Sequence, residues 1–285
     1  MKLNIRQLDN FCLEILDVDL AQIDDATFEA LRETWQSNPL LLLRRQSLTE
    51  TELVALSARF GKLEVIVRKD ILSRRQPEVA YISNLRDESG ESIGGLGSYD
   101  LRWHTDQSYR EKPATGAIFL AVEMPEDCGN TWWANTEMAY EALPPETQAQ
   151  LEGMEGMFKY ILYEGDIQDE PDVRDIRNQT PDATHPLVLT NPANGKKSLY
   201  LDITQTFGIV GMDPDRGEAL LKELKAHMSR DEFVYKHQWR VGDVMMWDNS
   251  RLQHRRDPYD AALPRLAKRT TIFLPPEQFP VPYQP

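Results

Sequence analysis

Apolar residues recur every three or four positions over Asp25–Gln36, where Phe28, Leu31 and Trp35 fall on one face. This spacing predicts an amphipathic helix that packs against a core. The apolar run Leu40–Arg44 follows after a short break and predicts a buried strand.

A second helix start comes directly after this strand. Thr49 and Glu52 have the spacing of a capping box, in which each side chain binds the other residue's backbone N–H. Gly61 is a typical helix terminator and ends the segment. The chain is therefore expected to open with an α/β part over about residues 1–62.

From residue 79 onward, short β-rich runs separated by turn-forming residues replace this pattern. Two longer segments, 136–153 and 215–229, have helical periodicity instead. Many short strands with few helices favour a mainly β protein of the α+β class, with an antiparallel sandwich or jelly-roll core over about residues 79–275. The runs are Val79–Ile82, Gly116–Val122, Leu187–Thr190, Ser198–Leu201, Val244–Trp247 and Thr270–Leu274.

One segment within this core has little periodicity. Residues 163–184 are acidic and polar and form a long stretch for a structureless loop, which favours a lid. No Gly/Ser-rich linker or internal repeat divides the sequence. We therefore expect a single domain over residues 1–285.

Composition and charge restrict the partners. The 285 residues carry a formal charge of −14 at pH 7, with a pI near 4.9, and this charge argues against nucleic acid as a partner. No apolar run approaches the roughly 18–20 residues of a membrane span. The two cysteines, Cys12 and Cys128, suit a reducing compartment. We expect a cytoplasmic protein that does not contact membranes and that forms a homo-oligomer, as is common for soluble proteins.

Candidate chemistry begins with the histidines. His104 and Asp106 stand two residues apart and share a face if the segment is extended, so they could hold a divalent metal together. His254, which follows the β-like run Val244–Trp247 and a turn, is the best candidate for a third ligand. Two histidines and one carboxylate form the facial triad of non-haem Fe(II) oxygenases, whereas zinc prefers a closed tetrahedral site or a single open position.

A basic stretch follows His254. Arg265 and Arg269 stand four residues apart and fall on the same side of a strand. A buried guanidinium is costly unless it meets an anion. The spacing is thus compatible with a buried anion site, without establishing one, whereas Lys268 between them is expected to face solvent.

These residues and their surroundings resemble the Fe(II)/2-oxoglutarate-dependent dioxygenases of the taurine dioxygenase and 2,4-D dioxygenase (TauD/TfdA) type. The offsets agree, because Thr131 follows Asp106 by 25 residues and Arg265 and Arg269 follow His254 by 11 and 15 residues. The supporting motifs, in order, are Leu42-Leu43-Arg44, Arg59-Phe60-Gly61, Trp103–Asp106, Pro113–Ile118, Gly129-Asn130-Thr131, Ala139–Leu143, His185–Val188 and Gly242–Asn249.

The resemblance implies a role for each of these positions. The three candidate ligands would bind Fe(II). Thr131 and Arg265 would hold the distal carboxylate of 2-oxoglutarate, and Arg269 would lie near its other carboxylate or near a substrate anion. The implied fold is a double-stranded β-helix, which is a jelly roll with flanking helices. The implied reaction uses O2 and 2-oxoglutarate to hydroxylate an unactivated C–H bond and releases succinate and CO2.

The resemblance also indicates where the substrate binds. In this family the loop after the Phe-Gly motif and the stretch before the His-x-Asp motif form much of the pocket, here residues 65–75 and 94–102. Both carry basic residues in an acidic chain, so we expect a small to medium anionic metabolite. The loop lacks the histidine of the taurine enzymes, which argues against taurine itself. The expected substrate-binding residues are Arg68, Lys69, Asp100, Arg102 and Arg269.

Three alternatives remain open at this point. The same oxygenase chemistry could end in desaturation or oxidative cleavage within a biosynthetic pathway. A zinc or manganese hydrolase could use the same triad, although hydrolysis gives no reason for the arginine pair and the Thr131 offset. A non-catalytic protein could use the site to bind an anion.

Overall fold

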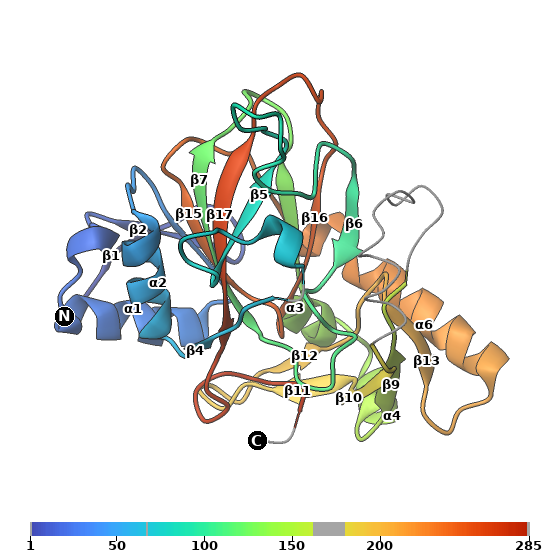
Figure 1. Cartoon of the computed structure of the whole chain (residues 1–285). Coiled ribbons are helices and arrows are strands. Elements are labelled where there is room, and N and C mark those ends of the chain that lie inside the picture. The colour runs from blue at the N-terminus through green and yellow to red at the C-terminus, as the bar shows by residue number, and fades with distance from the viewer. Residues whose placement is uncertain (1, 67, 162–179, 284–285) are drawn as a thin grey trace.

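The computed structural model describes residues 2–66, 68–161 and 180–283. Within these ranges a large sheet has the strand order β1-β2-β3-β15-β7-β17-β4, and β5 also pairs with β17 (Figure 1). Its described pairs are antiparallel apart from the parallel pair β2–β3. The strands are β1 (Asn4–Gln7), β2 (Cys12–Leu16), β3 (Leu40–Leu43), β4 (Lys62–Leu63), β5 (Val79–Ser83), β7 (Gly116–Glu123), β15 (Val244–Asp248) and β17 (Leu266–Phe273).

A smaller antiparallel sheet faces the large one and has the order β14-β8-β16-β6. Phe119 and Trp247 of the large sheet share one buried cluster with Trp133 and Leu252 of the small sheet, so the two sheets enclose a common core. This arrangement is a jelly roll. The strands are β6 (Leu101–His104), β8 (Thr131–Asn135), β14 (Val234–His237) and β16 (Leu252–Arg256).

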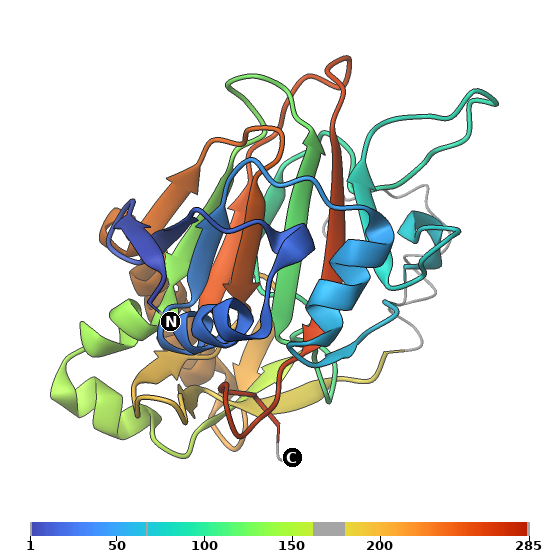
Figure 2. The same ribbon diagram turned by 90° about the vertical axis from the view of Figure 1, so that its left-hand side faces the viewer.

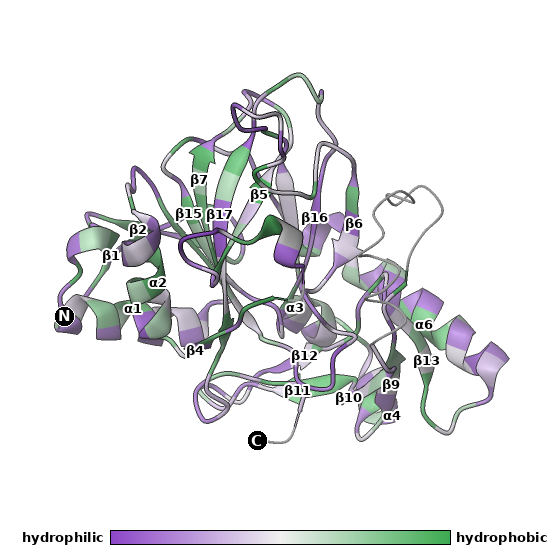
Figure 3. Cartoon of the chain, viewed as in Figure 1, coloured by the Kyte–Doolittle hydropathy of each residue, from purple (hydrophilic) through white to green (hydrophobic). Residues whose placement is uncertain are grey.

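Side chains alternate between the two faces of the large sheet, and the face away from the jelly-roll core is covered by a layer of helices. In β7, Phe119 points into the jelly roll, whereas Ile118 and Leu120 belong to a cluster with the helices on the other face. Figure 2 shows α1 (Asp25–Ser37) and α2 (Glu50–Ala58) lying across that face. The strand β7 is accordingly apolar over most of its length (Figure 3).

The remaining elements pack beside the small sheet around a third apolar cluster. They are α3 (Thr136–Glu141), α4 (Pro145–Leu151), α6 (Pro214–Met228), β9 (Glu155–Phe158), β10 (Ala183–Pro186), β11 (Val188–Thr190), β12 (Lys197–Leu199) and β13 (Thr206–Ile209), together with the 3-10 turn η3 (Asp231–Phe233). The 3-10 turns η1 (Leu20–Gln22) and η2 (Lys69–Ile71) pack elsewhere, because Leu20 and Ile71 belong to the clusters of the large sheet. No helix in the described part of the chain combines the length and the apolar character needed to cross a membrane.

The fold class and most of the predicted elements are confirmed. The predicted N-terminal helix is α1, and the capping box of α2 forms as expected. The strand β1 was not expected because all four of its residues are exposed, so the apolar pattern of a buried strand is missing.

Two predicted elements have different bounds in the structure. The single helix expected over 136–153 is divided into α3 and α4, because Pro144 and Pro145 cannot continue a helix. The β-rich run expected over Thr270–Leu274 is part of a strand that begins at Leu266 and includes Arg269. Lys268, which was expected to face solvent, is only partly exposed. Its ammonium lies 3.1 Å from a carboxylate oxygen of Glu50 on α2.

The lid prediction lies mostly outside the described residues. Positions 163–179 of the expected lid are not described, and Ala183 and Thr184 at its end begin β10. Ala183 and Thr184 pair with Phe158 and Met157 of β9.

Candidate functional site

A cavity of about 210 Å³ opens between the two sheets. Apolar residues from both sheets and both predicted substrate loops line it, including Ile66, Ile71, Leu96, Leu101, Phe119 and Trp247. The described residues that line the cavity include four arginines, Arg68, Arg256, Arg265 and Arg269. They include one carboxylate, that of Asp106. The cavity is thus locally basic in an acidic chain and suits anionic ligands.

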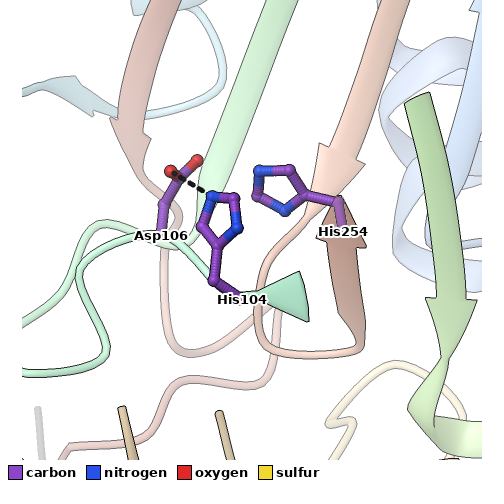
Figure 4. A group of neighbouring side chains, drawn as sticks. All are labelled: His104, Asp106 and His254. Carbon is purple, nitrogen blue, oxygen red and sulfur yellow. Dashed lines mark ion pairs between the residues drawn. The ribbon is translucent and has the colours of Figure 1, made fainter. Parts of the chain in front are cut away.

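His104, Asp106 and His254 converge at this cavity (Figure 4). His104 ends β6 and lies opposite His254 of β16, and Asp106 follows in the turn after β6. One ligand atom from each of the three residues lies within 4.8 Å of the others. His104 Nε2 is 3.9 Å from Asp106 Oδ1, and the two imidazole centroids are 4.1 Å apart. The three side chains could hold one metal ion.

The surroundings of both histidines suit metal binding. His104 Nδ1 lies 2.7 Å from the backbone oxygen of Arg102, so Nδ1 donates its proton there and Nε2 is the nitrogen left for a metal. Burial, and then the neighbouring His104, lowers the pKa of His254 to about 3. A neutral imidazole is the form that binds a metal.

Two residues that the sequence analysis did not select hold the turn between the ligands. The buried Asp202 accepts hydrogen bonds from Thr105 N at 3.1 Å and from Ser108 Oγ at 2.6 Å. The backbone oxygen of Asn249 accepts a bond from Thr105 Oγ1 at 2.7 Å. These contacts fix the backbone on both sides of Asp106. The sequence offers little signal for Asp202, which is about one hundred residues away from the motif.

Arg269 lies beside the candidate ligands. Its Nη1 donates to both oxygens of Asp106 at 3.0 Å. Burial by itself raises the pKa of Asp106, but the charge of Arg269, with smaller contributions from the two histidines, lowers it to about 2. Asp106 is therefore an ionised carboxylate at neutral pH.

Thr131 and Arg265 also line this cavity. The Arg265 side chain is 1% exposed, and its Nε and Nη1 have no hydrogen-bond partner among the described residues. Burial, and then the nearby Arg256, lowers the pKa of Arg265 to about 9. Thr131 Oγ1 accepts a bond from Trp239 Nε1 at 2.9 Å, so its own proton can be donated elsewhere. This pair offers donors to an anion.

The five residues predicted to bind substrate are separated by the fold. Arg68 and Arg269 line the cavity. Lys69, Asp100 and Arg102 are exposed and are not among the cavity-lining residues. The two predicted loops do reach the cavity, but mainly through apolar side chains. Arg256 of β16, which lines it, was not selected because an arginine in a basic run gives no sign of burial.

Fold and site together define a jelly-roll protein with a two-histidine, one-carboxylate cluster beside a basic cavity. Residues 4–271 match the family model described as "Taurine catabolism dioxygenase TauD, TfdA family". The chain belongs to this family of dioxygenases.

Two relatives illustrate the range of the family. The chain is 30% identical to an alpha-ketoglutarate-dependent 2,4-dichlorophenoxyacetate dioxygenase of Cupriavidus pinatubonensis, covering 92% of this chain and 94% of the relative. It is also 30% identical to a pentalenolactone F synthase of Streptomyces arenae, with 85% and 86% of the two chains covered.

Solved structures agree with this assignment. A taurine dioxygenase from Burkholderia xenovorans superposes with a TM-score of 0.79 at 26% identity, over 100% of this chain and 96% of that one. AAD-2, solved in complex with Mn(II) and N-oxalylglycine, superposes with a TM-score of 0.77 at 27% identity, over 96% and 98% of the two chains. Neither the hydrolase nor the non-catalytic alternative is favoured by these relatives.

Proposed function

We propose that this chain is an Fe(II)- and 2-oxoglutarate-dependent dioxygenase that hydroxylates an unactivated C–H bond of a small to medium anionic metabolite and releases succinate and CO2. The observation that carries this proposal is the convergence of His104, Asp106 and His254 within 4.8 Å. The buried Arg256 and Arg265 line the same cavity and have no carboxylate partner among the described residues. The names of the relatives, which are alpha-ketoglutarate-dependent enzymes, support the same chemistry.

The donor set fits the proposed metal. His104, Asp106 and His254 would supply two imidazole nitrogens and one carboxylate to Fe(II), a ligand set that leaves positions for further ligands. The buried Nδ1 of His254 has no hydrogen-bond partner in the described part of the chain, which fits a site completed by a ligand. When bound, Fe(II) supplies the redox chemistry that couples O2 and the 2-oxo acid to C–H oxidation.

The surrounding residues bind and orient the reactants. Thr131 and Arg265 would hold the distal carboxylate of 2-oxoglutarate, since both can donate into the cavity. Arg269 would orient Asp106 and lie near the other carboxylate or a substrate anion. The largely apolar lining lowers the local dielectric, which strengthens these charged contacts.

The proposed substrate contacts follow from the charge of the arginines and from their position at the cavity. We assign Arg68 and Arg269 to an anionic group because both line the cavity. The 2,4-dichlorophenoxyacetate named for the Cupriavidus relative is an anion with an apolar body, and the cavity combines the same two characters. A pentalenolactone F synthase among the relatives makes a biosynthetic substrate compatible with this proposal.

The setting of the enzyme completes the proposal. We infer one domain over residues 1–285, because β1–β3 of the N-terminal part continue the large sheet. Free Cys12 and Cys128 favour a cytoplasmic location. We also infer a homo-oligomer, the common state of soluble assemblies, without nucleic-acid or membrane partners.

The test is anaerobic. Adding Fe(II) and 2-oxoglutarate to the metal-free protein should produce a weak visible charge-transfer band, which His254→Ala should abolish. His227→Ala is the matched control, because this histidine lies on α6 and its Nε2 bonds the backbone oxygen of Ala139. A folded wild-type protein that gives no band, or a band that survives in His254→Ala, contradicts the proposal.

A further inference from the structure

Arg256 is a second buried cation in the cavity. Its side chain belongs to β16, two residues beyond His254 on the same face of the strand, and the residue is 3% exposed. Nη1 donates to the backbone oxygen of Leu96 at 2.8 Å and Nη2 to that of Tyr99 at 2.6 Å. Nε is buried and has no partner among the described residues. A guanidinium has five N–H donors, so Arg256 keeps donors for a ligand.

The fold places Arg256 next to the proposed cosubstrate residues. In the β16–β8 register Arg256 lies directly opposite Thr131, and such cross-strand neighbours have Cβ atoms about 4.5–5.5 Å apart. The guanidinium carbons of Arg256 and Arg265 lie 5.3 and 5.8 Å from the ring centroid of Tyr259. Thr131, Arg256 and Arg265 thus surround one end of the cavity.

Two cations at this end have no ion-pair partner in the described residues. Asp100, a carboxylate whose charge acts on Arg256, is exposed and is not among the cavity-lining residues. Buried like charges repel each other, and an anion between them removes that cost. We propose that Arg256 acts with Arg265 as a second guanidinium for the distal carboxylate of 2-oxoglutarate. Through Leu96 and Tyr99 it also ties cosubstrate binding to the loop 94–102. This inference rests on the proposed function.

The test compares two 2-oxo acids on Mn(II)-loaded protein by calorimetry, without turnover. 2-Oxoglutarate has the distal carboxylate, whereas 2-oxopentanoate carries a methyl group in its place. In Arg256→Gln the affinity for 2-oxoglutarate should fall about 10- to 100-fold, the loss expected for one charge-assisted contact. Affinity for 2-oxopentanoate should change less than about threefold, which also verifies that the variant is folded.

Arg255→Gln is the matched control. Arg255 is the neighbouring residue on the opposite side of β16, where it stacks on Trp132 and pairs with Asp257 at 2.8 Å. It should leave both affinities unchanged. Arg256→Lys keeps the charge but not the fork, so it should retain part of the discrimination between the two acids.

The remaining outcomes separate the inference from the proposed function. Equal losses for both acids would mean that Arg256 only supports the loop, and unchanged affinities would mean that it has no part in binding. Either result overturns the inference while leaving the proposed function intact. Wild-type protein that binds neither acid overturns both.

Discussion

Arg269 Nη1 lies 3.0 Å from each carboxylate oxygen of Asp106, and both side chains are 11% exposed. The carboxylate that completes the candidate metal cluster is thus also the partner of a mostly buried guanidinium. Stability and metal binding depend on the same group.

This shared role predicts a coupled effect in a double-mutant cycle. Asp106→Asn leaves the Arg269 charge without its partner, so the metal-free protein should lose about 3 kcal/mol of unfolding free energy. Arg269→Met added to Asp106→Asn should recover about 1–3 kcal/mol of that loss. Urea denaturation of these two variants and of the Arg269→Met single variant measures the stability. Metal analysis should find no Mn(II) bound to the two variants that lack Asp106. Additive losses would show that the pair contributes nothing.

For Arg265 we expect the opposite effect, in which replacement of the residue increases the unfolding free energy. Because this buried cation has no partner among the described residues, Arg265→Met should raise the unfolding free energy of the ligand-free protein by about 1–3 kcal/mol. The 2-oxoglutarate concentration required for half-maximal turnover should rise at least about tenfold, because a charge-assisted contact is lost.

Arg251→Met is the contrasting variant for this prediction. Arg251 is equally buried, but it pairs with Asp248 at 2.8 Å and donates to the backbone oxygens of Trp35 and Gln36. Its replacement should destabilise the protein, since it leaves Asp248 buried and unpaired. A stabilised Arg251→Met, or a destabilised Arg265→Met, would be inconsistent with this explanation.

The hydrogen bonds to Glu50 should make its contribution to the unfolding free energy depend on pH. Burial by itself raises its pKa, but hydrogen bonds from Ser73, Tyr81 and Lys268 outweigh burial and lower the pKa below 4.5. A lowered carboxyl pKa contributes stability above the unfolded-state value, and this stability is lost as the pH falls through the folded-state value. Glu50→Gln should therefore cost about 1–2 kcal/mol at pH 7 and less as the pH falls below about 4.5.

Chemical denaturation between pH 7 and about pH 3 measures this difference. Glu218→Gln, at an exposed position on α6, is the control and should show no such trend. A Glu50→Gln penalty that stays constant below pH 4.5 would assign the effect to packing rather than to charge. Because Ser73 belongs to the loop 65–75, the same variant should also weaken substrate binding.

Gly61 lies after α2, where there is no room for a side chain beside the end of β17. A Cβ built at this position lies 2.2 Å from the backbone oxygen of Phe273, so Gly61→Ala should destabilise the protein by about 1–3 kcal/mol. Gly217→Ala on α6 meets only contacts of 3.8 Å or more and should stabilise by about 0.5–1 kcal/mol, the helix preference of alanine. Thermal melts of the two variants should shift in opposite directions.

Local patterns in the sequence determined much of this protein. The apolar spacing over Phe28, Leu31 and Trp35 specified α1, and the capping box specified α2, because both depend on residues within a few positions. The His-x-Asp motif and the offsets to Thr131 and Arg265 likewise indicated residues that the fold brings to one cavity. Short-range geometry and repeated motif spacing are properties of the chain itself.

Tertiary structure alone decided which charges are buried. Lys69, Asp100 and Arg102 look as suitable for an anion as Arg68, yet they are exposed away from the cavity lining. Arg256 and Asp202 acquire their positions from β16 and from a long-range contact to the turn after β6. Whether a charge faces water or a cavity depends on strand register and packing between distant segments, which no local pattern of residues encodes.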